Sequence, residues 1–442
     1  MLFGTQRVNS RGRLEIGGCD TVELAERFGT PLYVMDEALL RQNCRDYLES
    51  FRSRYPNMDI AFAGKSFLTT AICQIVHQEE LSLDVVSSGE IHTALKANFP
   101  MERVYFHGNF KSEAELRMAL DKGVGKIVVD NAQELELLNS LAMAEGGKAD
   151  ILLRLTPGID PHTHRLIRTG QADTKFGLNI KDGSARSAVK RALECPGIGL
   201  RGIHCHLGSQ ILDTNAHAAA VRIMVEFARE VLDATGFAVE EINTGGGLGI
   251  RYVEEQNPPT IDEFAEAVAG TYVQCLEEFD LHEPKLVQEP GRSIVGTAGT
   301  TLYTVGTIKR VPITEDPGYR TYVAVDGGLT DNPRPLLYDA VYTALVASRA
   351  DTEPSQTVTI SGKHCETDTL IHDARIAEVA AGDILAVLCT GAYNYSMASN
   401  YNRFTRPAAV LVADGRADVI VERETLDDLV RHDVVPDRLL GK

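Results

Sequence analysis

Two polar segments carry side chains that could act on a small-molecule ligand. Lys65 stands in the run Ala-Gly-Lys-Ser, and a lysine amine removed from water loses its proton more easily and can form a Schiff base. Taken alone, Lys65 fits an ordinary surface lysine better. His204 and His206 are one residue apart, so a strand would present both rings on one face. Such a pair can bind a metal ion, or one imidazole can stack on a planar ring while Ser209 reaches a phosphate.

Three glycines, a carboxylate and a guanidinium follow in two later segments. Gly245, Gly246 and Gly247 stand in succession, and such a run exposes backbone N–H groups that suit a phosphate, although it is often only a turn. Glu289 and Arg292 are three residues apart in the run Gln-Glu-Pro-Gly-Arg-Ser. The two segments therefore add an anion site and a charged pair to the candidate chemistry.

Short apolar runs that alternate with helical patterns must position these side chains. Such alternation indicates parallel βαβ units, because each crossover returns the chain to the same end of the sheet. The count favours a closed (β/α)₈ TIM barrel, with an open doubly wound sheet as the alternative. The eight runs lie near residues 59–63, 82–86, 103–106, 126–129, 150–155, 201–206, 240–244 and 285–288.

The pattern changes after about residue 290. Strand-like runs with turn signals follow one another there with few helices between them, which predicts a second, mainly antiparallel β-barrel domain. The first 35 residues also hold strand-like runs. We therefore expect a barrel over residues 38–290 and a β domain built from residues 1–37 and 291–442. A long polar stretch, 157–183, is expected to be a functional loop or a surface insertion.

In such a barrel, chemistry lies at the carboxyl ends of the strands, where the candidate residues stand. A lysine, two histidines, a glycine run, a carboxylate and an arginine are what pyridoxal phosphate needs. The lysine takes the aldehyde, the glycines and Arg292 take the phosphate, an imidazole covers the ring, and a carboxylate keeps the pyridine nitrogen protonated. No suitable set of further metal ligands stands at the strand ends, so we expect no metal.

Composition excludes several other classes. The 442 residues hold 62 acidic and 44 basic side chains, a net charge of −18, which argues against nucleic acid and anionic membrane surfaces as partners. No run approaches the length of a transmembrane helix, and the N-terminus shows no signal pattern. Eight scattered cysteines without a C-x-x-C pair fit reduced thiols. We expect a cytoplasmic enzyme or small-molecule binder.

The motifs resemble those of the diaminopimelate decarboxylase family, within the fold-type III (alanine racemase-like) pyridoxal phosphate enzymes. The likeness runs from about residue 30 to 407. Single segments are shared with ornithine and arginine decarboxylases, whereas the combination in the last third is more specific. The motifs are Leu83-Asp-Val-Val-Ser-Ser-Gly-Glu90, His107-Gly-Asn109, His204-Cys-His-Leu-Gly-Ser-Gln210, Gly245-Gly-Gly-Leu-Gly-Ile250, Glu289-Pro-Gly-Arg292, Arg334-Pro-Leu-Leu-Tyr338, Cys365-Glu366 and Gly391-Ala-Tyr393.

The resemblance implies a role for each matching residue. Lys65 holds the cofactor as a Schiff base, His206 stacks on its ring, and Glu289 pairs with the pyridine nitrogen. Ser209 and the glycines Gly245, Gly246 and Gly247 hold the phosphate. The distal end of the substrate is bound by four residues, Arg292, Arg334, Tyr338 and Glu366.

The resemblance also implies a homodimer with shared active sites. Tyr393 contacts cofactor and substrate, Cys365 donates a proton, and Cys365 and Glu366 arrive from the partner chain. From the residues alone, a buried thiol beside a surface charge fits Cys365 better than a general acid. The sequence departs from the family pattern at Gly64, at Thr367 and at Pro333, which biases the residue before it toward an extended backbone.

The implied reaction is decarboxylation of meso-2,6-diaminopimelate to L-lysine and CO₂, the last step of lysine biosynthesis. Three alternatives remain open. The same scaffold could decarboxylate ornithine, arginine or carboxynorspermidine. A non-catalytic pyridoxal phosphate carrier would resemble the barrel alone, and a metal-dependent barrel hydrolase would use His204 and His206.

Overall fold

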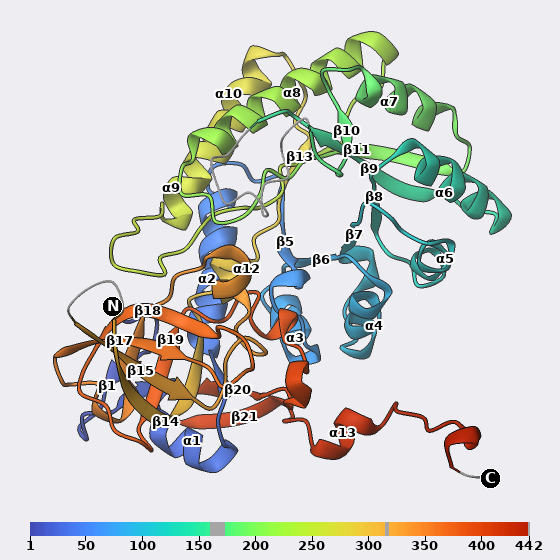
Figure 1. Cartoon of the computed structure of the whole chain (residues 1–442). Coiled ribbons are helices and arrows are strands. Elements are labelled where there is room, and N and C mark those ends of the chain that lie inside the picture. The colour runs from blue at the N-terminus through green and yellow to red at the C-terminus, as the bar shows by residue number, and fades with distance from the viewer. Residues whose placement is uncertain (160–172, 314–317, 441–442) are drawn as a thin grey trace. The chain divides into compact units, whose positions relative to one another are not determined.

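The computed structural model describes residues 1–159, 173–313 and 318–440, so much of the long polar stretch, including His162, His164, Arg165 and Arg168, lies outside the described residues. The chain divides into two compact units. Met1–Leu39 and Thr297–Lys442 form one, which we call the β unit, and Leu40–Gly296 form the other, the barrel unit (Figure 1).

The barrel unit is a closed parallel barrel, which confirms the predicted fold class. Within the described residues, eight strands pair in parallel around the barrel, and pairing between β8 and β9 closes it. A short strand, β10 (Leu178–Asn179), adds to β9. The barrel strands are β5 (Met58–Ala63), β6 (Ser82–Val85), β7 (Val104–Phe106), β8 (Lys126–Val129), β9 (Ala149–Thr156), β11 (Ile198–His204), β12 (Glu241–Asn243) and β13 (Lys285–Gln288).

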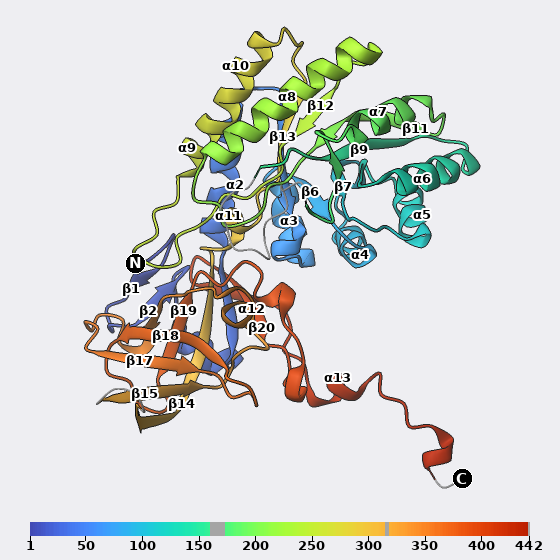
Figure 2. The same cartoon turned by 45° about the horizontal axis from the view of Figure 1, so that its top comes forward.

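Helices ring the outside of these strands (Figure 2). Several begin just past a strand end because a polar side chain caps them: Ser87 Oγ accepts from the Glu90 amide, and Asn131 Oδ1 accepts from the Glu134 amide. The strand ends are thereby held in short turns, where candidate site residues stand. The outer helices are α2 (Glu37–Arg52), α3 (Thr70–Gln78), α4 (Ser88–Lys96), α5 (Glu113–Asp121), α6 (Ala132–Ala144), α7 (Ser184–Glu194), α8 (Asn215–Thr235), α9 (Ile261–Ala265) and α10 (Thr271–Glu278). The short, buried α11 (Arg292–Val295) follows the carboxyl end of β13.

The β unit holds a mostly antiparallel sheet, which confirms the predicted class of the second domain. β4, from the N-terminal part of the chain, lies between β14 and β20, so both chain ends contribute strands. A buried cluster that includes Val34, Leu302 and Val410 packs this sheet. Its strands are β4 (Leu32–Asp36), β14 (Gly299–Pro312), β15 (Tyr319–Val325), β16 (Ala344–Val346), β17 (Gln356–Ser361), β18 (Thr369–Ile376), β19 (Ile384–Leu388), β20 (Ala408–Ala413) and β21 (Arg416–Val421).

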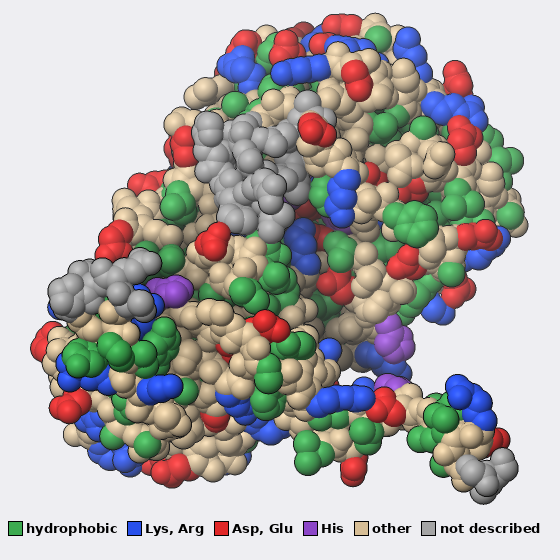
Figure 3. Space-filling model, in the orientation of Figure 1, with side chains coloured by type: hydrophobic (Ala, Val, Ile, Leu, Met, Phe, Trp, Pro, Cys, Tyr) green, Lys and Arg blue, Asp and Glu red, His purple; other side chains and the backbone are tan. Residues whose placement is uncertain are grey.

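A small sheet and three short helices complete the β unit: β1 (Arg7–Val8), β2 (Leu14–Ile16), β3 (Cys19–Asp20), α1 (Thr21–Phe28), α12 (Arg334–Tyr338) and α13 (Leu426–Val430). No helix among the described residues is long and apolar enough to cross a membrane. On the face drawn in Figure 3, acidic and basic side chains are interspersed.

Candidate active site

The barrel brings its candidate residues to one end, because the carboxyl ends of parallel strands meet there. Lys65 lies in a 3₁₀ turn, Gly64–Ser66, that follows β5. His204 is the last residue of β11, and Glu289 follows β13 directly. Arg292 begins α11 three residues farther on. Strand ends distant in sequence thus supply one site.

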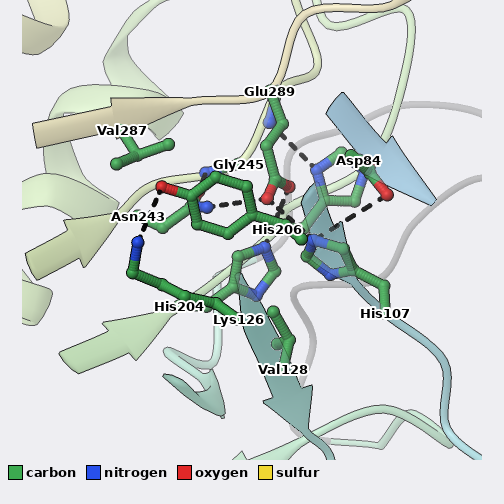
Figure 4. A network of polar contacts seen from close by, with 12 residues as sticks. Asp84, His107, Lys126, Val128, His204, His206, Asn243, Gly245, Val287 and Glu289 are labelled. Carbon is green, nitrogen blue, oxygen red and sulfur yellow. Dashed lines mark hydrogen bonds and ion pairs between the residues drawn. The ribbon is translucent and has the colours of Figure 1, made fainter. Parts of the chain in front are cut away.

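Glu289 is the buried centre of this site (Figure 4). His204 Nε2 lies 3.0 Å from its Oε2, and Asn243 Nδ2 donates to its Oε1 at 2.7 Å. His107 Nε2 lies 2.9 Å from Oε1. Burial alone would raise the pKa of Glu289, but the facing imidazoles of His107 and His204 hold that pKa well below its usual range. The carboxylate therefore stays ionised.

The two predicted histidines make different contacts. Burial lowers the pKa of His204 to about 4, so its ring is neutral beside Glu289. His206 Nδ1 accepts from the Gly246 amide at 3.2 Å, and burial lowers its pKa well below the usual value. In the described part of the chain, the group of potential metal ligands joins His204 to His107 and Glu289 rather than to His206.

Lys65 connects to Glu289 through two further side chains. Its Nζ lies 3.3 Å from Oδ2 of the fully buried Asp84. Asp84 Oδ1 in turn lies 3.8 Å from His107 Nε2. The Lys65 side chain is about one-third exposed, at 36%. An amine therefore stands at the barrel mouth beside a buried carboxylate.

The glycine run has a steric reason as well as a predicted role. A Cβ at Gly245 would come within 2.4 Å of the Cys205 carbonyl oxygen, and one at Gly246 within 2.0 Å of the Glu289 carbonyl oxygen. The Gly245 amide donates to Asn243 Oδ1 at 2.9 Å, and the Gly246 amide donates to His206. Two of the three amides are engaged inside the protein, and the phosphate role of the run stays a prediction.

Ser209 and Arg292 meet beside this run. Arg292 Nη2 donates to Ser209 Oγ at 2.8 Å, and the Arg292 side chain is buried. A second hydroxyl, that of Tyr252, accepts from Arg292 Nη1. A buried guanidinium with two hydroxyls is a suitable anion site. Tyr252 is absent from the residues predicted from the sequence.

In the β unit, Arg334 lies among aromatic rings. It begins α12, and Pro333 before it has helical torsion angles (φ −75°, ψ −10°). The guanidinium lies 5.5 Å from the Tyr338 ring centroid and 5.7 Å from that of Tyr393. Arg334 Nε donates to Tyr342 Oη at 2.9 Å. Three predicted residues are thus together, and Tyr342 is a partner that sequence reasoning missed.

Cys365 and Glu366 are exposed on a loop of the β unit. The other seven cysteines are buried. The Cys365 amide donates to Asn402 Oδ1 at 3.2 Å, and Tyr401 Oη donates to Glu366 Oε1 at 2.5 Å. An accessible thiol therefore stands beside an oriented carboxylate.

His107 and Asn243 were also missed as site residues, although His107 stands in a motif quoted for the family. Asn243 is the last residue of β12, directly before the glycine run. A polar residue at the end of a buried barrel strand is the signal that could have indicated it.

Comparison with known proteins identifies the class of the barrel and its site. A model of the pyridoxal binding domain of pyridoxal-dependent decarboxylases matches residues 40–296. The residues present fit that cofactor: an amine at the mouth, an ionised buried carboxylate and a buried guanidinium with hydroxyls. The barrel is thus that of a pyridoxal-dependent decarboxylase, with pyridoxal 5′-phosphate as cofactor.

Full-length relatives identify the family. The diaminopimelate decarboxylase of Bacillus subtilis is 48% identical over 434 residues, 98% of each chain. That of Bacillus methanolicus is 46% identical over 95% of this chain and 96% of its own. The crystal structure of M. jannaschii diaminopimelate decarboxylase in complex with L-lysine matches with a TM-score of 0.92 and 36% identity, covering 99% of this chain and 100% of that one. The chain belongs to the diaminopimelate decarboxylase family.

Proposed function

We propose that this chain removes CO₂ from the D-configured carbon of meso-2,6-diaminopimelate and yields L-lysine. One observation carries the proposal: the likeness to diaminopimelate decarboxylases spans 98% of the chain at 48% identity. It therefore includes the β unit, in which Arg334, Tyr338, Cys365 and Glu366 stand. A pyridoxal phosphate carrier that matched the barrel alone would lack this second half of the likeness.

Pyridoxal 5′-phosphate, when bound, supplies an electron sink for the pair released as CO₂ leaves. Lys65 would hold the cofactor through its side-chain nitrogen, which Asp84 orients from 3.3 Å. Glu289 would face the ring nitrogen, and its ionised state suits a protonated ring. His206 would cover one ring face as a neutral imidazole, because burial lowers its pKa.

The phosphate would lie between Arg292 and the glycine run 245–247. The guanidinium of Arg292 is already positioned by Ser209 Oγ at 2.8 Å. Bound phosphate can share this guanidinium with the hydroxyls, which would then donate to phosphate oxygens. Lys65 and the phosphate contacts would together hold the cofactor at both ends.

The distal end of the substrate would be recognised by the β-unit residues. The Arg334 guanidinium, which lies near the rings of Tyr338 and Tyr393, suits a carboxylate. Glu366 suits the distal ammonium group. The Cys365 thiol would then donate its proton to the Cα atom that has lost CO₂.

We further propose a cytoplasmic homodimer in which Cys365 and Glu366 complete the site of the partner chain. The exposure of both residues supports this, since a group that protonates Cα must be covered when it acts. Eight free cysteines without a disulfide fit a reducing compartment.

The test combines a spectrum with a substrate panel. The wild-type protein should show the absorbance of lysine-bound cofactor and release CO₂ from meso-diaminopimelate in preference to ornithine, arginine and carboxynorspermidine. Lys65→Ala should lose both properties, whereas Lys122→Ala, at an exposed lysine on the barrel unit, should keep them. Equal rates with ornithine, or CO₂ release by Lys65→Ala at the wild-type rate, would refute the proposal.

A further inference from the structure

The Glu289 carboxylate has three nitrogen partners, contributed by three different strand ends. His107 follows β7, His204 ends β11 and Asn243 ends β12. The contacts are 2.9 Å from His107, 3.0 Å from His204 and 2.7 Å from Asn243. All four residues are at most 4% exposed. Figure 4 shows them converging on the carboxylate.

Hydrogen positions at two of these contacts follow from the chemistry of the partners. An ionised carboxylate only accepts hydrogen bonds, so a neutral His204 must carry its hydrogen on Nε2 and donate it to Glu289. The Asn243 amide is oriented by its other end, because Oδ1 accepts from the Gly245 amide at 2.9 Å. Its Nδ2 therefore points toward Glu289 as a donor.

Because Glu289 is buried, its ionised form depends on these donors. A carboxyl group removed from water favours its protonated form unless hydrogen bonds or opposite charges stabilise the anion. The same site holds another carboxylate, Asp84, 3.8 Å from His107, so the local negative charge also favours protonation of Glu289. Without its donors, Glu289 would take a proton and then share it with the ring nitrogen of the cofactor.

We propose that His107, His204 and Asn243 are positioning residues that keep Glu289 ionised, so that the proton of the Glu289–pyridine pair resides on the ring nitrogen. The inference rests on the proposed function, because it requires the cofactor ring opposite Glu289. A protonated ring withdraws electrons more strongly, and loss of a donor therefore weakens the electron sink rather than substrate binding.

The experiment measures the protonation state of the cofactor's ring nitrogen directly. Holoenzyme reconstituted with ring-¹⁵N pyridoxal 5′-phosphate gives a ¹⁵N chemical shift that reports whether this nitrogen is protonated. His204→Leu removes the donor at similar size, and His204→Gln replaces it with an amide N–H. We expect His204→Leu to move the shift toward the unprotonated value and lower kcat about tenfold to a hundredfold, with KM little changed. His204→Gln should restore most of both.

His217 offers a matched control. It is a buried histidine on α8 that contacts the Phe264 ring rather than Glu289, and burial lowers its pKa to about 4 as it does for His204. His217→Leu should leave the ¹⁵N shift at the wild-type value. His107→Leu provides a second test, at the imidazole whose Nε2 lies 2.9 Å from Glu289 Oε1, should His204→Leu fail to fold.

Two results would overturn the inference. The first is a wild-type ¹⁵N shift in a folded, cofactor-loaded His204→Leu or His107→Leu protein. The second is an equal change of the shift in His217→Leu, which would assign the effect to any lost buried imidazole. Failure of the proposed function is distinguishable from both, because the wild-type protein would then show no lysine-bound cofactor or no CO₂ release from diaminopimelate.

Discussion

Cys365 differs from the other cysteines in its exposure, and this difference decides which thiol can exchange a proton with a substrate. Burial raises the pKa of Cys44, Cys73 and Cys205 to about 12, so these thiols are inert. Cys365→Ala should lower turnover about a hundredfold or more while the absorbance of bound cofactor is retained. Steady-state CO₂ release together with the spectrum checks this. Cys195→Ala, at a buried cysteine after α7, should keep wild-type turnover.

The aromatic surroundings of Arg334 make its guanidinium hard to replace. Its planar guanidinium is flanked by the rings of Tyr338 and Tyr393, which a lysine ammonium would not reproduce. Arg334→Lys should therefore raise KM for meso-diaminopimelate roughly tenfold or more, with a smaller effect on kcat. A variant with unchanged KM would show that the distal carboxylate binds elsewhere. The cofactor spectrum serves as the control, because it should not change.

At the scale of elements, the loop that carries Cys365 and Glu366 is braced by a buried network. His364 Nε2 lies 2.8 Å from Thr330 Oγ1, and its Nδ1 contacts the Asp368 carboxylate. Asp368 Oδ1 also accepts from the Leu329 amide at 2.8 Å. Two segments of the β unit are thus held together directly behind the exposed thiol.

Asp368→Asn should loosen this loop, because the amide group cannot accept at both ends as the carboxylate does. We expect turnover to fall and protease cleavage between residues 362 and 368 to accelerate, while cofactor binding is unchanged. Asp373→Asn, in the same unit at an exposed position of β18, is the matched control. Unchanged turnover and cleavage in Asp368→Asn would show that the network does not position Cys365.

The elements were also the part of the fold that the sequence predicted best. Apolar runs bounded by turn signals indicated the barrel strands, because buried parallel strands are short and continuously apolar. The partners of Glu289 were not predictable in this way. His107 and Asn243 meet one carboxylate only because the barrel closes, and no local period reports which strand ends face each other. For the same reason, the sequence did not predict that His204 contacts Glu289 whereas His206 contacts the Gly246 amide.

At the scale of the whole molecule, buried histidines make stability depend on pH. Burial lowers the pKa of His217 from 6.5 to about 4. As pH falls from about 6.5 to 4, His217 takes up a proton in the unfolded chain but stays neutral in the folded chain. The free energy of unfolding therefore falls over this range. At about 1.4 kcal/mol per pKa unit, this histidine accounts for roughly 3 kcal/mol over that window. His217→Leu should flatten the pH dependence of the urea unfolding midpoint, and an unchanged slope would contradict this.

A site shared between two chains can be tested by complementation between variants. If Cys365 acts in the site of the partner chain, Lys65→Ala and Cys365→Ala are defects in different halves of one site. Each variant alone should be inactive as a homodimer. A mixed dimer has one site with both defects and one with neither, because a two-fold axis exchanges the halves. Random mixing makes half of the dimers mixed, so activity should recover to about a quarter of wild type. The two variants would be mixed in the presence of pyridoxal 5′-phosphate, allowed to exchange subunits, and assayed for CO₂ release. Equal mixtures that stay inactive after proven exchange would place Lys65 and Cys365 of the same chain in one site.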